Sequence, residues 1–190
     1  MKKTLFLLMA MGLVTPSLKA QDVAPLTYSE VIQVDGVSKD ELYNRAKLFL
    51  VNSFDNANRV IHSDDKEAGI IVIKAIMHCQ TRIPTTGRAW AHSLNSSVRY
   101  TLTLSVKDGR YKVDVEDLTY NGDDEYIRFP VLLTTSELEP GHNSAKGKNN
   151  IRFRQLVWDE TKKQVDEYFS NLFLTINSGM TKPSPAAEDW

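Results

Sequence analysis

The pattern of apolar and polar positions, with the turn signals between them, predicts five strands in this chain. Residues 98–107 have apolar side chains at every second position, which indicates a strand with one buried and one solvent-facing side. Asp108-Gly109 is a strong signal for a tight hairpin turn, and residues 111–120 follow as the partner strand. Short runs of apolar and β-branched residues, followed by turn signals, predict further strands at residues 28–34, 59–63 and 70–78.

Two segments instead carry apolar residues at helical spacing. Ser38 and Glu41 form a capping box, and the apolar stripe that follows predicts a helix to about Asn56. The clear part of a second helix runs from about Trp158 to Ser178, with Gly179 suited to its C-cap. The stripes consist of Leu42, Ala46, Phe49, Leu50 and Phe54 in the first helix and of Val165, Tyr168, Phe169, Leu172, Phe173 and Ile176 in the second.

The predicted element order is β-α-β-β-β-β-α, an α+β fold with a curved antiparallel sheet. Two amphipathic helices and a sheet with one apolar face have complementary surfaces, so we expect both helices to pack on that face. The opposite face would then be open to solvent or to a partner.

The N-terminus has the pattern of a secretory signal peptide. A basic start, Met1-Lys2-Lys3, precedes an apolar run from Thr4 to Val14, and Ala20 is a small residue at the expected cleavage site. The run is shorter than the roughly 20 apolar residues that a membrane span needs. We therefore expect cleavage after Ala20 and export to the periplasm or the extracellular space as a soluble protein.

Composition adds limits on the class of protein. With 42% apolar and 25% charged residues, the chain is typical of globular proteins. No acidic residue lies in residues 1–20, which hold three of the 23 basic residues, so residues 21–190 have 20 basic against 24 acidic residues and a net charge of −4. Such a charge does not favour nucleic acid as a partner.

The length of the exported part suits one hydrophobic core. Cys79 is the only cysteine, so no disulfide can form within the chain. We expect a flexible leader at residues 21–27, one α+β domain at residues 28–179 with long loops at 79–97 and 121–150, and a flexible tail at residues 180–190.

Several turns and caps resemble those of a known family. They are the strand at residues 28–34, the helix opening at residues 37–43, the Asp65-x-Glu67-x-Gly69 turn and the hairpin at residues 106–111. Over residues 28–120 and the C-terminal helix, the chain resembles the secreted Bacteroidetes proteins grouped as domain of unknown function 4468, with a TBP-like fold. The resemblance implies a curved sheet backed by helices and export. It implies neither DNA binding nor any catalytic residue.

No catalytic or metal-binding motif stands out. His78 and Cys79 are adjacent on a predicted strand and therefore point to opposite faces, so the imidazole is poorly placed to activate the thiol. His62, Asp64 and Asp65, like the acidic run Asp123, Asp124 and Glu125, are better explained as solvated turns than as metal sites. We expect no cofactor and no metal, and the catalytic residues, if any exist, are unknown.

The two long predicted loops share one end of the sheet, because alternate connections of an antiparallel meander lie at the same end. Loops on a rigid scaffold are common binding sites, and arginine and aromatic side chains are enriched at binding hot spots. Phe129 and His142 lie in the same loops, and Phe129 is equally suited to covering the core edge. The candidate binding residues are Arg82, Arg88, Trp90, His92, Tyr126 and Arg128.

The sequence favours a non-enzymatic binding or interaction module of the cell envelope, whose partner is an unknown protein or small ligand. The alternative is a hydrolase or isomerase with its site at the same loop end, and turnover of generic esterase, glycosidase or peptidase substrates would distinguish the two. A third possibility is an assembly component that pairs through a sheet edge or through the open face.

The signal-peptide hypothesis predicts that the exported protein begins at or near Gln21. N-terminal sequencing of protein recovered from the cell envelope would measure this. Recovery of chains that retain Met1 in the inner membrane would contradict the prediction.

Overall fold

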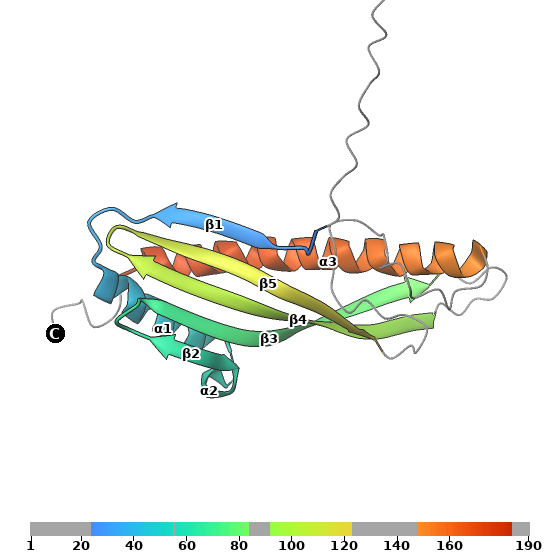
Figure 1. Ribbon diagram of the computed structural model, residues 1–190, viewed down its shortest axis with the longest axis horizontal. Coiled ribbons are helices and arrows are strands. Elements are labelled where there is room, and N and C mark those ends of the chain that lie inside the picture. Colours follow the sequence, from blue (N-terminus) through green and yellow to red (C-terminus); the bar gives the residue numbers. More distant parts are fainter. Residues whose placement is uncertain (1–23, 55, 84–91, 123–147, 184–190) are drawn as a thin grey trace, which may run out of the picture.

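The computed structural model describes residues 24–54, 56–83, 92–122 and 148–183. The described elements follow the predicted order β-α-β-β-β-β-α, with one short helix added before the second strand (Figure 1). In chain order they are β1 (Tyr28–Gln33), α1 (Lys39–Ser53), α2 (Ala57–Val60), β2 (Ile61–Asp65), β3 (Ile70–Ile83), β4 (His92–Lys107), β5 (Arg110–Gly122) and α3 (Lys148–Thr181).

The described strands form an antiparallel sheet in the order β1-β5-β4-β3-β2. β3 and β4 are the long central pair, in register from Ile70↔Ser105 to Ile83↔His92. The outer strands β1 and β2 are short and cover only the half of the sheet next to the tight turns. Helices α1 and α3 lie on one face of this sheet, which confirms the predicted two-layer α+β arrangement (Figure 1).

The start of α1 is where the sequence predicts it. The Ser38 side chain accepts a hydrogen bond from the Glu41 backbone N–H, with 3.3 Å between the two atoms. This N-cap satisfies one of the backbone donors that the first turn of a helix leaves without a partner. The predicted strand at residues 59–63 begins later, at Ile61, because the Arg59 N–H donates to the Asn56 carbonyl at 3.0 Å and closes the helical turn of α2.

The central strands are longer than the sequence predicts. Residues 79–83 and 92–97, assigned to a loop from their polar character, belong to β3 and β4. Their side chains keep the strand alternation, with Thr81 and Ser96 buried on the helix side although both are polar. Polarity was a poor guide here, because a helix covers this half of the sheet and buries polar and apolar residues alike.

Helix α3 is also longer than predicted at both ends, from Lys148 to Thr181. Residues 148–150, assigned to the second long loop, are helical. Gly179 lies inside the helix and is not its C-cap. A Cβ atom at Gly179 would lie 3.2 Å from the Phe49 ring, so the glycine favours the close approach of α1 and α3.

Arg45 ties α1 to the C-terminal end of α3. Its buried guanidinium donates to the Glu41 carboxylate at 2.8 Å and to the Met180 carbonyl at 2.9 Å. The last carbonyls of a helix lack partners within the helix and favour a nearby positive charge. Arg45 therefore caps α3 from the neighbouring helix.

The core lies between the helices and the inward side of the sheet. Tyr28, Tyr100, Tyr168 and Phe169 form an aromatic cluster there, in which the ring centroids of Tyr100 and Phe169 are 5.0 Å apart with nearly perpendicular planes. Edge-to-face contacts of this kind favour aromatic packing. The largest fully buried side chains are Tyr100, Tyr111, Phe169, Leu42, Leu50, Ile71, Ile73, Leu102, Leu104 and Leu118.

This packing predicts a large loss of stability when either central aromatic residue of the helix layer is truncated. Phe49 and Phe169 are both buried, so Phe49→Ala or Phe169→Ala should lower the free energy of unfolding by about 3–5 kcal/mol. Urea unfolding would measure the loss. Leu174 of α3 is 68% exposed, so Leu174→Ala is a matched control that should cost about 0.5 kcal/mol or less. Equal losses in all three variants would contradict the packing.

Several buried groups in the core keep their protons to unusually high pH. Burial raises the pKa of the Cys79 thiol to about 11 and, together with the nearby Glu30 charge, that of Tyr111 to about 12. Burial and hydrogen bonds to Asp166 and Tyr168 also raise the pKa values of Tyr28 and Tyr100. In the unfolded chain these groups lose their protons at lower pH, so the folded state holds more protons in alkali.

The stability should therefore be highest below about pH 9 and fall as the pH rises toward 11, the window of the Cys79 shift. The contribution of Cys79 to this fall should be about 2 kcal/mol by about pH 10.5. Urea unfolding of the wild type and of Cys79→Ala across this range would measure it. A fall of the same size in Cys79→Ala would assign the alkaline loss to other groups.

Candidate functional site

The strand ends at one end of the sheet lie where the two connections predicted as long loops begin and end. Ile83 at the end of β3 pairs with His92 at the start of β4, and Gly122 at the end of β5 pairs with Ser96. The connections after β3 and after β5 therefore start from the same end of the sheet, as the meander argument predicts. We call this end the loop end.

Two of the six candidate binding residues fall within the described part of the chain. Arg82 is exposed on β3 and pairs with Ser93 of β4. The next pair along the strands joins Ile83 with the backbone of His92, so Arg82 and His92 lie on neighbouring strands at the loop end. The other four, Arg88, Trp90, Tyr126 and Arg128, lie outside the described residues, as do Phe129 and His142. Their use in binding stays a prediction.

The opposite end of the sheet, which we call the turn end, is closed by short, hydrogen-bonded turns. Gly69 has a φ of +72°, its carbonyl accepts from the Val106 N–H at 2.8 Å, and a Cβ there would lie 2.7 Å from the Val106 oxygen. The Asp108 carboxylate accepts from the Lys39 N–H at 2.7 Å and joins the hairpin to the start of α1. These bonds fix the scaffold at the turn end.

The His78-Cys79 pair has the arrangement that the strand alternation predicts. Cys79 is 4% exposed and faces the helices, whereas His78 is exposed on the opposite face. The buried thiol, with its raised pKa, stays protonated near neutral pH. This arrangement does not form a nucleophile–base pair.

The side of the sheet opposite the helices carries a broad solvent-facing surface, which we call the open face. It includes Arg99 and Thr101 of β4, and the Thr101 hydroxyl donates to the Asp117 carboxylate at 3.1 Å. Asp117 has a φ of +56° where β5 bulges against β4, and the bulge turns two successive acidic residues, Glu116 and Asp117, away from the core. The open face includes Ser29, Val31, Gln33, Ile70, Val72, Lys74, Ile76, His78, Gln80, Arg82, Ser93, Asn95, Ser97, Arg99, Thr101, Thr103, Ser105, Lys107, Arg110, Lys112, Asp114, Glu116, Asp117, Thr119 and Asn121.

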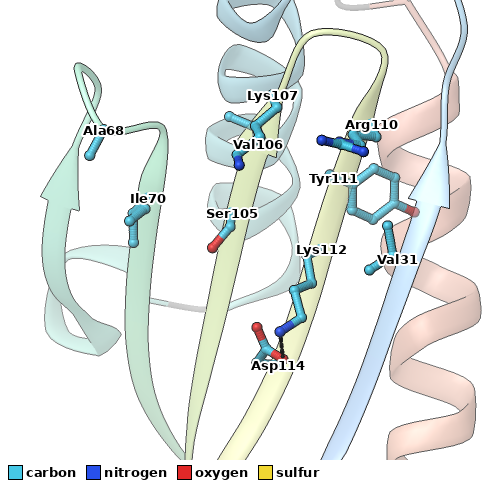
Figure 2. A pocket seen from close by; sticks show the side chains of 10 residues that line it. All are labelled: Val31, Ala68, Ile70, Ser105, Val106, Lys107, Arg110, Tyr111, Lys112 and Asp114. Atoms are coloured by element: carbon cyan, nitrogen blue, oxygen red, sulfur yellow. Dashed lines mark ion pairs between the residues drawn. The ribbon is translucent and has the colours of Figure 1, made fainter.

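A hollow of about 420 Å³ lies near the turn end of this face (Figure 2). Its apolar part includes Val31, which is 55% exposed, and Ile70. Lys107 and Arg110 face each other across β4 and β5 at its rim, and neither forms an ion pair with a described residue. The hollow therefore combines apolar contact area with two positive charges.

A third cation in the hollow is already neutralised. Lys112 Nζ lies 2.7 Å from the Asp114 carboxylate, which also accepts from the Ser29 hydroxyl at 2.7 Å (Figure 2). Sequence reasoning missed this hollow, because its lining comes from β1, β3, β4 and β5, which are distant along the chain. The available signal was the run of Lys107, Arg110 and Lys112 around the hairpin.

Two kinds of feature are absent from the described part of the chain. Residues 24–54, 56–83, 92–122 and 148–183 contain no group of three or more His, Cys, Asp and Glu side chains placed to hold a metal ion. Within the same ranges, no helix combines the length and the apolar character that crossing a membrane requires.

Comparison with solved structures finds the same fold in two Bacteroidetes proteins. A DUF4468 family protein from Bacteroides ovatus has a TM-score of 0.53 at 13% identity, covering 85% of this chain and 89% of its own. A TBP-like protein from Parabacteroides distasonis has a TM-score of 0.50 at 15% identity, with 84% of this chain and 95% of its own covered. At these identities the likeness concerns the fold alone.

The sequence comparisons agree with this result. No curated protein matches the chain. The family model described as a domain of unknown function (DUF4468) with TBP-like fold matches residues 28–121, which span β1 to β5. The α+β sheet with two helices on one face confirms the fold that the sequence resemblance implies. Through these residues, the chain belongs to the family of the domain of unknown function DUF4468 with TBP-like fold.

Proposed function

We propose that this protein is an exported, non-enzymatic binding module of the cell envelope that holds its partner at the loop end of the sheet. The observation that carries the proposal is the meeting of the strand ends, Ile83 with His92 and Ser96 with Gly122. The short connection of residues 84–91 and the long connection of residues 123–147 thereby start from one end of a sheet whose other end is fixed by tight turns. A rigid scaffold with loops at one end is a common arrangement in binding proteins.

The composition of the loop end supports contact with a partner. Arg82 is exposed beside the β3–β4 connection, which contains Arg88 and Trp90, and the segment after β5 contains Tyr126 and Arg128. Arginine and aromatic side chains bury large areas and form directional contacts, so they supply much of the affinity at protein interfaces. The domain of residues 28–179 would present these side chains to a protein or a small ligand.

Export is supported by the N-terminal pattern. A basic start, a short apolar run and Ala20 at the expected cleavage position are typical of a secretory signal. We place the mature protein in the periplasm or outside the cell. In this setting the single cysteine, Cys79, is protected from oxidation by its burial in the core.

The proposal predicts that Arg88 and Trp90 matter for binding and little for folding. The double variant Arg88→Ala/Trp90→Ala should keep its thermal midpoint within a few degrees of the wild type, as about 0.5 kcal/mol or less implies for surface sites. It should weaken capture of the partner at least about tenfold, because a truncated interface anchor typically costs about 2 kcal/mol. The measurements are thermal unfolding and quantitative capture from envelope extracts of the source cells, with the purified chain as bait.

Lys66→Ala at the turn end is the matched control. Lys66 is exposed, and its weak ion pair with Asp40, at 4.0 Å, is of the kind that contributes little. This variant should change neither the midpoint nor the capture. Unfolding of the double variant would show that Trp90 covers the core, and unchanged capture by a folded double variant would move the binding site to the open face.

A further inference from the structure

The outer edge of β3 is covered by a neighbouring strand over only part of its length. β2 pairs with Ile70–Ile73, whereas β3 continues to Ile83. Beyond Ile73, no described strand pairs with this edge, and Figure 1 shows β3 continuing past the start of β2. An uncovered edge presents backbone N–H and C=O groups that can pair with another strand.

A side chain of α3 shows which residues of β3 direct their backbone outward. Gln80 donates its N–H to the Gln164 amide oxygen at 3.0 Å, and its carbonyl accepts from Gln164 Nε2 at 3.1 Å. The Gln164 amide thus makes the two hydrogen bonds that a residue of a neighbouring strand would make. Because the direction alternates along an antiparallel strand, Lys74, Ile76 and His78 also point their backbone groups outward.

The uncovered part of the edge therefore has two defined limits. β2 pairs with the edge as far as Ile73, α2 contacts β3 next to the start of β2, and Gln164 occupies the edge at Gln80, which leaves residues 74–78 without a described strand partner. This length is close to that of an average strand. The edge is therefore long enough for one short extended segment to pair with it.

The side chains along this stretch identify the chemistry of a partner. Ile76 is 52% exposed on the open face, and Lys74 and His78 flank it on the same face of β3. Arg99 lies beside Ile76 on β4 and is also exposed. Lys74, His78 and Arg99 form no ion pair with any residue that the structure describes. The acidic residues of this face on β5, which are Asp114, Glu116 and Asp117, lie on the far side of β4.

We propose that residues 74–78 of β3 bind an extended segment of a partner protein that carries acidic side chains at alternate positions. The segment would join the sheet at the edge and exchange backbone hydrogen bonds with Lys74, Ile76 and His78. Its acidic side chains would lie on the open face, beside Lys74 and Arg99, where opposite charges across neighbouring strands are favourable. This inference goes beyond the loop-end function, because the edge is a separate surface.

A second copy of the chain is a poorer occupant of the same edge. A two-fold antiparallel pairing about Ile76 places Lys74 of each copy opposite His78 of the other, with Arg99 from both copies nearby. Such an arrangement gives the lysines no acidic neighbour and gathers Lys74 and Arg99 of both copies on one stretch of the sheet, without an opposite charge to offset them. Lysine on an edge strand is a common means of preventing self-association.

The first experiment uses synthetic peptides and the unaltered, full chain. A fluorescently labelled peptide that alternates Glu and Val should bind, as measured by anisotropy, and the matched peptide that alternates Lys and Val should bind at least about tenfold more weakly. N-methylation of every second backbone amide, those that would face β3, should abolish binding of the acidic peptide. N-methylation of the alternate amides, which would face away from β3, should not. Equal effects of the two methylation patterns would overturn the proposal.

Amide hydrogen exchange locates the binding. The amides of Ile76 and His78 should exchange fast in the free protein and slow markedly when the acidic peptide is bound. The Gln80 amide is an internal reference, because its bond to Gln164 protects it in both states. If the peptide binds without slowing amide exchange at Ile76 and His78, its site lies elsewhere and the proposal is overturned.

Protein variants separate the edge from the rest of the surface. Ile76→Pro removes one outward N–H without removing a hydrogen bond to β4, so it should weaken binding of the acidic peptide at least about tenfold. Lys74→Glu should also weaken this binding. Two controls should leave it unchanged: Lys66→Glu, which makes the same charge change at the turn end, and Arg110→Ala in the hollow. If Ile76→Pro does not fold, the methylated peptides and Lys74→Glu still decide the question.

Light scattering tests whether a second copy of the chain, instead of a partner protein, occupies the β3 edge. The chain should remain monomeric at the concentrations used for peptide binding. A dimer that Ile76→Pro or Lys74→Glu dissociates would assign the edge to self-pairing and overturn the proposal. If the edge proposal fails, the proposed loop-end function is unaffected, because that function is measured separately with the Arg88→Ala/Trp90→Ala variant.

Discussion

The packing of α3 against the sheet and against α1 is the constraint on which the rest of the structure depends. The apolar stripe of α3 buries Val165, Phe169 and Ile176 across the inward side of the strands. At its C-terminal end, the Arg45 guanidinium and the Phe49–Gly179 contact hold the helix against α1. Because both helices lie on one side, the inward side chains of β3, β4 and β5 form the core and their outward side chains form the open face.

The same packing makes the two ends and the two edges of the sheet different. The turn end is held by hydrogen bonds from the Val106 N–H to the Gly69 carbonyl and from the Lys39 N–H to the Asp108 carboxylate, so its connections are short and fixed. At the other end the central strands extend past β1 and β2, and α3 alone supports them within the described residues. Gln164 of α3 reaches the backbone of Gln80 there, so the long helix closes one position of the β3 edge, and residues 74–78 have no strand partner among the described residues.

Membership of the DUF4468 family fixes an architecture and leaves the chemistry to the surface of each member. The solved relatives share the fold at 13% and 15% identity, and a fold alone does not determine function. In this chain the buried Cys79 thiol is inert, whereas the exposed features are positive charges beside apolar side chains, at the hollow and at the β3 edge. The proposed binding role rests on this combination.

The sequence alone determined the order of the elements, the N-cap at Ser38, the hairpin at Asp108-Gly109 and the inward residues of the central strands. These features are local, because capping, turn geometry and the period of apolar residues act over a few neighbouring positions. Only the tertiary structure decided that the polar residues 79–83 and 92–97 are strand, that Gly179 lies inside α3, and that the hollow and the uncovered β3 edge exist. Each of these depends on residues far apart in the chain, such as Gln80 and Gln164 or Phe49 and Gly179, which no local pattern relates.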